Sequence, residues 1–407
     1  MKVLQINSVC GIGSTGRITV DLYHALKKEG HECLVAYGRN NSSTDMEILR
    51  IGGFIQVCIH ALYSRITDRS GFGSKRATRR LIKKISEYKP DIIHLHNIHG
   101  YYINIALLFD YLRDLNIPVV WSLYDCWSFT GHCCHFDYVG CEKWKSGCGR
   151  CMQKKEYPAT LFIDNSRNNY KRKRKLITSC KNITIVTPSK WLSGLISSSY
   201  LNTCPFVMIP SGIDLDCFKP TPSDFRINNH LNNKFIVLGV SSGFGKFKGS
   251  EYFIWLANHL PEKFQLVLIG VTKEQAKNYP EKVLTLPRTN STSELAGFYS
   301  AADVFVNPTL QESQGLTNIE ALACGTSVVT FNSGGSPECI DENCGFVVNR
   351  GDAKGLLEGI KQACYYPFSS EACMTRASYF DKKKLNQEYI KLYERIYYTN
   401  VTSQSEL

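Results

Sequence analysis

The chain alternates short β-rich runs with helical segments in two successive series, and this alternation restricts the fold more than any other feature. The first series contains the predicted strands KVLQINSV, HECLVAYG, DIIHLH, PVVWSLY and ITIVTPS, and its predicted helices include 16–28 and a basic amphipathic helix at 75–88. The second series begins with FIVLGV and continues through FQLVLIG, DVFVNP and TSVVTF. Strands that alternate with helices form parallel sheets covered by helices on both faces. The sequence therefore predicts an α/β protein with two doubly wound, Rossmann-like domains facing a cleft.

A proline-rich segment, IPSGIDLDCFKP, separates the two series and indicates an irregular linker at 209–220. A chain of 407 residues is long enough for two domains. We expect an N-terminal domain at 1–208, with a cysteine-rich insertion at 126–151. A second domain should follow at 221–380, and a C-terminal helix and tail at 381–407.

Neither a membrane span nor a signal peptide is predicted. No apolar run approaches the roughly 20 residues that cross a bilayer. The start, MKVLQINSVCGIG, is interrupted by Asn7, Ser8 and Gly11 too early for a signal peptide. We therefore expect a cytoplasmic protein.

The net charge of +12 is concentrated in two runs, KRATRRLIKK at 75–84 and YKRKRK at 170–175. Such runs form solvated helix faces, contact anionic lipid or bind nucleic acid. No helix-turn-helix, zinc-finger or RNA-binding motif accompanies them, so nucleic acid is not an expected partner. Solvated faces and a membrane surface both remain open.

Seventeen cysteines are present, and most lie singly in apolar segments, as small buried side chains do. Only the insertion concentrates them, with the spacing C-x7-C-x6-C-x2-C formed by Cys133, Cys141, Cys148 and Cys151. Four thiolates satisfy a tetrahedral structural zinc ion. The alternative is a packed loop with reduced thiols.

Two glycine-rich loops follow predicted strands. Gly11, Gly13 and Gly16 follow the first strand, where they form either a phosphate-facing loop or a tight turn. The loop SSGFGKFKG follows FIVLGV and carries Lys246 and Lys248. Lysine on such a turn suits a diphosphate, whereas the alternative is a lysine that only faces solvent.

Polar side chains follow other predicted strands. HLHNIHGYY carries His94, His96 and His99, which either line the cleft or form satisfied structural contacts. The next strand ends at Tyr124 and Asp125 in SLYDCW. In doubly wound sheets, ligands bind beyond the carboxyl ends of the strands, so these residues are candidates for a site.

The stretch QESQGLTNIEALACG places Glu312 and Glu320 eight positions apart, on either side of a Gly-Leu-Thr sequence. Thr317 and Glu320 have the spacing of a helix capping box, which gives this stretch a purely structural explanation.

Together these motifs resemble the family 4 retaining glycosyltransferases, which have the GT-B fold, over essentially the whole chain. The most specific mark is Glu312-x7-Glu320, with KFKG, IPSGIDLDCFKP and DIIHLHNIHGYY in support. The cysteine loop is similar to that of the subgroup that builds bacterial capsular, exopolysaccharide or lipopolysaccharide glycans, including colanic-acid-type enzymes. The resemblance implies that the C-terminal helix returns to the N-terminal domain.

The resemblance also implies a role for each matching residue. Glu312 would face the donor sugar and Glu320 would hold the donor ribose. Lys248 would neutralise the diphosphate, and Lys246 would replace an arginine that many relatives have nearby. The backbone of the helix start would bind the diphosphate, through Gly315, Leu316 and Thr317.

Four residues of the first domain are further candidates. Gly16 and Arg17 match a loop beside the phosphates and the acceptor. His96 would line the binding cleft. Tyr124 stands where relatives usually have histidine near the donor sugar, and tyrosine does not carry the charge of imidazole near neutral pH.

The implied activity is a metal-independent, retaining transfer of a hexose from a nucleotide diphosphate sugar to a glycan acceptor, with no catalytic cofactor. The acceptor would be lipid-linked, and the basic runs would dock on the anionic inner face of the membrane. Two alternatives remain: a non-catalytic nucleotide-sugar-binding or scaffold protein of the same fold, and a nucleotide-sugar epimerase.

Overall fold

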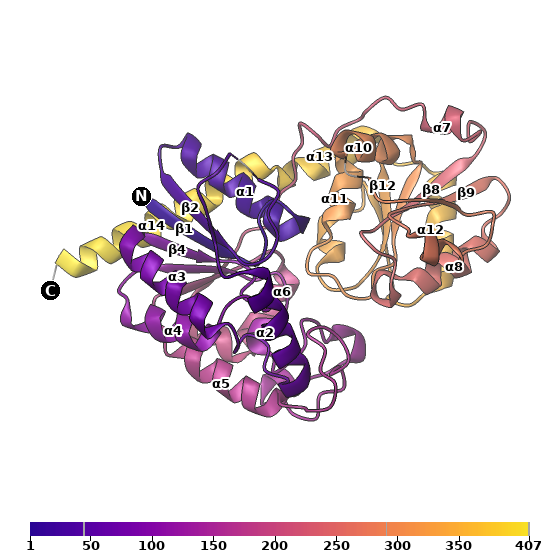
Figure 1. Ribbon diagram of the computed structural model, residues 1–407. Coiled ribbons are helices and arrows are strands. Elements are labelled where there is room, and N and C mark those ends of the chain that lie inside the picture. Colours follow the sequence, from indigo (N-terminus) through magenta and orange to yellow (C-terminus); the bar gives the residue numbers. More distant parts are fainter. Residues whose placement is uncertain (44, 290, 406–407) are drawn as a thin grey trace. The chain divides into compact units, whose positions relative to one another are not determined.

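A computed structural model describes residues 1–43, 45–289 and 291–405, with side chains as far as residue 400. The chain folds into two compact units, each built around its own parallel sheet (Figure 1). Unit 1 comprises Met1–Pro210 and Leu385–Leu407, and unit 2 comprises Ser211–Lys384.

Unit 1 has a parallel sheet in which the described strands follow the order β3-β2-β1-β4-β5-β6-β7. Its central strands are buried along their whole length, as expected for a sheet covered on both faces. The strands are β1 (Lys2–Asn7), β2 (Glu32–Tyr37), β3 (Ile48–Arg50), β4 (Ile92–Leu95), β5 (Val119–Ser122), β6 (Ile183–Thr187) and β7 (Phe206–Met208).

The helices of unit 1 confirm some predictions and correct others. The basic helix predicted over 75–88 is present with those bounds, because Leu81 and Ile85 give it one buried face. The first helix begins at Gly13, three residues before the expected start, and the helix at 54–67 was not predicted. The helices are α1 (Gly13–Lys28), α2 (Phe54–Thr67), α3 (Lys75–Tyr88), α4 (Ile105–Asp114), α5 (Ser166–Thr178) and α6 (Lys190–Ser198).

Unit 2 has a second parallel sheet, with the described strands in the order β10-β9-β8-β11-β12-β13. The strands are β8 (Phe235–Val240), β9 (Phe264–Ile269), β10 (Leu284–Leu286), β11 (Val304–Asn307), β12 (Ser327–Phe331) and β13 (Gly345–Val348). The helices are α7 (Phe225–Asn228), α8 (Ser250–His259), α9 (Lys273–Ala276), α10 (Thr292–Ala301), α11 (Leu316–Ala323), α12 (Ala353–Tyr365) and α13 (Ser370–Ala377).

The C-terminal helix α14 (Lys382–Ser405) leaves unit 2 and packs on unit 1 from Leu385 onward, which confirms its predicted return (Figure 1). Tyr389 and Tyr393, one helical turn apart, anchor it. The Tyr389 hydroxyl lies 2.9 Å from Ser122 Oγ, and the Tyr393 hydroxyl lies 2.5 Å from His94 Nδ1. His94 is therefore a structural contact of this helix.

Among the described residues, none of the helices combines the length and the apolar character that crossing a membrane requires.

Candidate active site

The turn that carries Lys248 is fixed against the end of β11. It forms a short 3-10 helix at Lys246–Lys248 and ends at Gly249, whose φ is +74°. A Cβ atom on Gly249 would lie 2.2 Å from the Pro308 carbonyl oxygen, so only glycine fits this approach. Leu310 N donates to the Phe247 carbonyl at 2.9 Å. This packing brings the loop after β8 beside the loop after β11.

These two loops bring Lys248 and Glu312 together. Lys248 Nζ lies 2.5 Å from Glu312 Oε2, although the residues are 64 positions apart. The Lys248 side chain is 43% exposed and that of Glu312 is 21% exposed, so both remain accessible to a ligand. Gly335 N donates to the Glu312 carbonyl at 2.9 Å, which fixes the glutamate backbone against the loop after β12.

Helix α11 begins at Leu316, in the same loop as Glu312, but without the capping box that the spacing of Thr317 and Glu320 suggested. Its N-cap is Gly315, with φ +98°, and no side chain caps it. Thr317 lies inside the first turn. The capping-box interpretation is therefore wrong, and the backbone N–H groups at Leu316 and Thr317 lie at a helix start without acidic side chains, where an anion is favoured.

Glu320 lies one turn further along α11 and is only 5% exposed. The Tyr299 hydroxyl, from α10, donates to Glu320 Oε2 at 3.0 Å. A buried carboxylate needs such partners, because its transfer from water is otherwise costly. Tyr299 therefore orients Glu320, and sequence reasoning missed this tyrosine because the two residues are joined only by packing.

Two buried polar atoms near Glu312 have no hydrogen-bond partner within the described chain. They are Gln311 Oε1, beside Glu312, and Ser333 Oγ, beside the Gly334–Gly335 turn under it. Most buried polar atoms in proteins are hydrogen-bonded. Their position suits a polar ligand bound at these loops.

The candidate residues of unit 1 lie at the ends of β1, β4 and β5. Gly16 is buried in the first turns of α1, and Gly11 N donates to its carbonyl at 3.0 Å. Arg17 follows it and is exposed. The glycines thus build a close turn at the start of a helix, with an exposed guanidinium beside it.

His96 is buried and joined to Tyr124. Its Nε2 lies 2.9 Å from Gln5 Oε1, and its Nδ1 lies 3.0 Å from the Tyr124 hydroxyl. Gln5 Nε2 donates to the Thr19 carbonyl, so Gln5 Oε1 accepts from His96. His96 Nδ1 must then accept from the Tyr124 hydroxyl. Burial lowers the pKa of His96 to about 3, which keeps the ring neutral.

A neighbouring pair, His99 and Asp125, was not singled out as a unit from the sequence. His99 Nε2 lies 2.7 Å from Asp125 Oδ2, and His99 Nδ1 lies 3.2 Å from the Tyr157 hydroxyl. Burial by itself would raise the pKa of Asp125, but the adjacent His99 lowers it. The pair adds a partly exposed polar group beside Tyr124.

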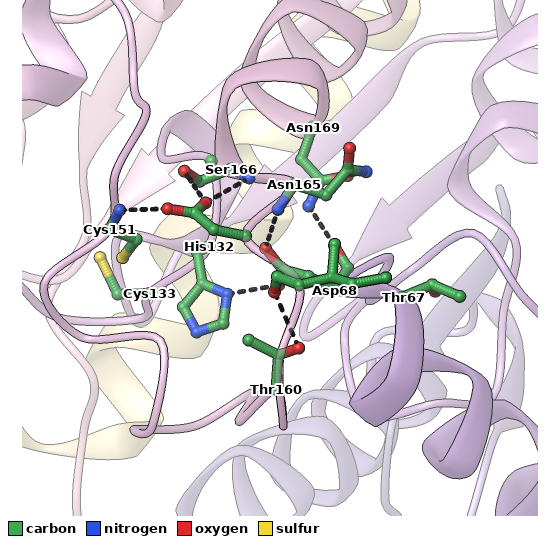
Figure 2. Close-up of polar contacts among 12 residues, drawn as sticks. Thr67, Asp68, His132, Cys133, Cys151, Thr160, Asn165, Ser166 and Asn169 are labelled. Carbon is green, nitrogen blue, oxygen red and sulfur yellow. Dashed lines mark hydrogen bonds and ion pairs between the residues drawn. The ribbon is translucent and has the colours of Figure 1, made fainter.

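A buried ion pair and its hydrogen bonds tie the insertion to the end of α2 and the start of α5 (Figure 2). His132 Nδ1 lies 2.5 Å from Asp68 Oδ1. Burial by itself would lower the pKa of His132, but the hydrogen bond with Asp68 raises it. Asp68 Oδ2 also accepts from Asn165 N at 2.7 Å, so the carboxylate joins the insertion to the start of α5.

The predicted zinc site is not supported. Cys133, Cys141, Cys148 and Cys151 line one cavity. In the described part of the chain, the one set of three metal-ligand atoms within 4.8 Å of one another belongs to other residues, namely His99, Asp125 and Cys134. The four sulfurs therefore do not converge as tetrahedral coordination requires. Burial raises the pKa of Cys148 to about 11, which favours a neutral thiol.

Comparisons with known proteins agree with this architecture. Residues 15–217 match the model of the family described as "Glycosyltransferase Family 4", and residues 234–364 match that of "Glycosyl transferases group 1". WcaC of Escherichia coli (strain K12), assigned as a colanic acid biosynthesis glycosyl transferase, is 22% identical over 97% of this chain and 100% of its own length.

Solved structures share the fold. Sucrose-phosphate synthase of Thermosynechococcus elongatus has a TM-score of 0.72 at 17% identity, covering 98% of this chain and 100% of its own. HepE of Anabaena, solved in complex with UDP, has a TM-score of 0.69 at 14% identity, covering 97% of this chain and 100% of its own. The chain therefore belongs to the family 4 and group 1 glycosyltransferases and has their GT-B fold.

Proposed function

We propose that the enzyme transfers a hexose from a nucleotide diphosphate sugar to a glycan hydroxyl, with retention of the anomeric configuration. The observation that carries this proposal is the Lys248–Glu312 pair at 2.5 Å, beside the start of α11. A cation, a carboxylate and a helix N-terminus at one place suit a ligand that has both phosphates and sugar hydroxyls.

In unit 2, each group has a distinct proposed role. Lys248 and the N–H groups of Leu316 and Thr317 bind the diphosphate and stabilise the charge that develops on it as it leaves. Lys246 adds positive charge beside this turn. Glu312 accepts hydrogen bonds from the donor sugar, and Glu320, held by Tyr299, accepts them from the ribose.

In unit 1, Gly16 and Arg17 approach the phosphates and the acceptor. Tyr124 stands beside the donor sugar, where its oxygen accepts a hydrogen bond while its proton is donated to His96. These assignments make residues 1–208 the acceptor domain and residues 221–380 the donor domain. Cations and backbone dipoles supply the positive charge that the leaving group requires, so the proposed reaction is metal-independent.

The similarity to WcaC supports a glycan of a bacterial surface polysaccharide as the acceptor class. Such glycans grow on lipid carriers, so we propose a lipid-linked acceptor and a site of action at the cytoplasmic face of the inner membrane. The basic residues of α3 and α5 suit an anionic membrane surface.

A transfer assay with a panel of nucleotide diphosphate sugars tests the proposal. We expect transfer with at least one donor, retention of configuration, and no loss of turnover after chelation of divalent metal. Release of a free or epimerised sugar without transfer would indicate an epimerase. Donor binding without any turnover would indicate a non-catalytic binding protein.

A further inference from the structure

Helix α2 is amphipathic in the reverse of the usual sense. Its buried residues are His60 and Ser64. The side that faces solvent carries large apolar side chains, and their exposed fractions are high: Phe54 73%, Ile55 72%, Ile59 62%, Leu62 58% and Ile66 47%. A surface helix normally buries its apolar side and exposes its polar side.

Specific hydrogen bonds fix this orientation. His60 Nδ1 lies 2.9 Å from Ser74 Oγ, and His60 Nε2 accepts from Gly73 N at 3.0 Å. Burial lowers the pKa of His60 to about 4, so the ring stays neutral in its site. Rotating α2 to bury its apolar side would remove both hydrogen bonds. The fold therefore holds the apolar side outward.

A loop extends this apolar surface. Leu161 N donates to the Arg65 carbonyl at 2.8 Å, and Thr160 Oγ1 donates to the same carbonyl at 3.1 Å. The three side chains after Thr160 in this loop are also exposed, Leu161 by 53%, Phe162 by 82% and Ile163 by 48%. We call these three residues and the five exposed apolar residues of α2 the apolar patch.

Polar contacts join the end of α2 to α5 and to the insertion (Figure 2). Asp68, the C-cap of α2, accepts from Asn165 N at 2.7 Å and pairs with the buried His132. The Asp68 backbone carbonyl also accepts from the Asn169 side chain in α5. The patch is thus tied to α5 and to the insertion by buried polar contacts.

Exposed basic side chains lie at the end of α2 and at the starts of the two helices joined to it. Arg65 and Arg69 lie at the end of α2, and α3 begins with Lys75 and Arg76, directly after the Gly73–Ser74 pair that contacts His60. The start of α5, joined to Asp68, carries the exposed Arg167 and Lys171. Residues 48–67 contain no aspartate or glutamate, whereas Asp164 directly follows Ile163 and accepts hydrogen bonds from Cys151 N and Ser166 N. Within the described chain, none of these basic residues has a carboxylate within ion-pair distance.

We propose that the apolar patch inserts into an anionic lipid bilayer while these basic side chains contact the headgroups. Apolar side chains on one side of a helix, flanked by arginine and lysine, are the features that hold a helix in a membrane interface. Each basic side chain near such a surface adds further attraction. An isologous dimer through the same patch would bring identical basic residues against one another, which opposes self-association.

This inference deepens the proposed function, because it would place the enzyme on the surface that carries a lipid-linked acceptor. It does not depend on catalysis. Vesicle binding can be measured without donor or acceptor, so failure of one proposal is distinguishable from failure of the other.

The test is co-sedimentation of the full chain with vesicles of phosphatidylglycerol and phosphatidylethanolamine, compared with vesicles of phosphatidylcholine. The combined variant Ile59→Ser and Leu62→Ser should lower partition into the anionic vesicles by about tenfold or more, at low and at high salt. Both residues are exposed in the protein, so thermal stability should be unchanged.

A matched control is Ile227→Ser with Tyr366→Ser. These two residues of unit 2 are 61% and 77% exposed, at least as much as Leu62 at 58%, and their replacement should leave binding unchanged. Lys75→Glu with Arg76→Glu should weaken binding at low salt and have a smaller effect at high salt.

Wild-type partition by the Ile59 and Leu62 variant would overturn the proposal. Two other results would also overturn it. One is a dimer in light scattering that the Ile59 and Leu62 variant converts to a monomer. The other is equally strong binding of the wild-type protein to phosphatidylcholine and phosphatidylglycerol vesicles.

Discussion

Lys248 Nζ and Glu312 Oε2 lie 2.5 Å apart in unit 2, with each side chain partly exposed. The pair joins the loop after β8 to the loop after β11. In the proposed reaction, the lysine turns toward the diphosphate and the glutamate toward the sugar. The ion pair therefore holds both side chains in place before the donor binds.

We expect Lys248→Met to lower kcat/KM by about a hundredfold or more, because it removes a cation from the developing charge of the leaving group. The free energy of unfolding should change by less than about 1 kcal/mol, since a partly exposed ion pair contributes little to stability. Steady-state kinetics and urea unfolding measure the two effects. Lys277→Met, at an exposed position of unit 2, is the control; equal kinetics for both variants would contradict the assignment.

Glu320→Gln should weaken binding of the donor nucleotide by about tenfold or more, because a neutral amide accepts weaker hydrogen bonds from ribose than a carboxylate does. Tyr299→Phe should have a smaller effect in the same direction, because Glu320 keeps its carboxyl group but loses the hydroxyl that orients it. Titration calorimetry with nucleoside diphosphates measures both. Unchanged affinity in Glu320→Gln would show that the ribose lies elsewhere.

Tyr124→Phe should lower the free energy of unfolding by about 1 kcal/mol, because His96 Nδ1 loses the hydroxyl that donates to it. In the proposed reaction the tyrosine oxygen binds the donor sugar, so the variant should also lower kcat by about tenfold. This is the effect expected from the loss of one neutral hydrogen bond in the transition state. Thermal unfolding and kinetics at saturating donor separate the effects. A loss of stability with wild-type kcat would leave Tyr124 a structural role only.

Acid should destabilise unit 1 through His96. The pKa of His96 is about 3 in the folded protein, against 6.5 for an unperturbed histidine. Between these values the unfolded chain binds a proton that the folded chain does not, so the free energy of unfolding falls as the pH decreases from 6.5 towards 3. Between these two pKa values, His96 lowers the free energy of unfolding by up to about 1.4 kcal/mol for each pH unit of acidification.

Urea unfolding between pH 6.5 and pH 4.5 checks this prediction. His96→Gln should reduce the slope of stability against pH, whatever its effect on stability at neutral pH. His230→Asn, at an exposed position of unit 2, should leave the slope unchanged. A slope in His96→Gln that equals the wild-type slope would refute the titration argument.

The sequence by itself determined most of the strands and helices and the loops that follow them, although helix α2 was not predicted. Strand and helix periodicities are local, so the two parallel sheets and the basic helix over 75–88 could be predicted. The KFKG turn and the Glu312–Glu320 spacing lie directly after strands, and the carboxyl ends of parallel strands lie at one edge of a sheet. The position of Lys248 on a glycine-rich turn predicted a diphosphate contact, and the resemblance to family 4 glycosyltransferases supplied the role of Glu312.

The tertiary structure decided which side chains meet. Lys248 contacts Glu312 across 64 positions, and His94 contacts Tyr393 across 299 positions. Helix α11 begins after Gly315, whose φ is +98°, so Thr317 lies inside the first turn and no capping box forms. The four cysteines of the insertion do not converge. Helix α2 holds His60 inward because Gly73 and Ser74 supply its partners. Partners of this kind depend on packing between distant segments, which no local pattern of residues encodes.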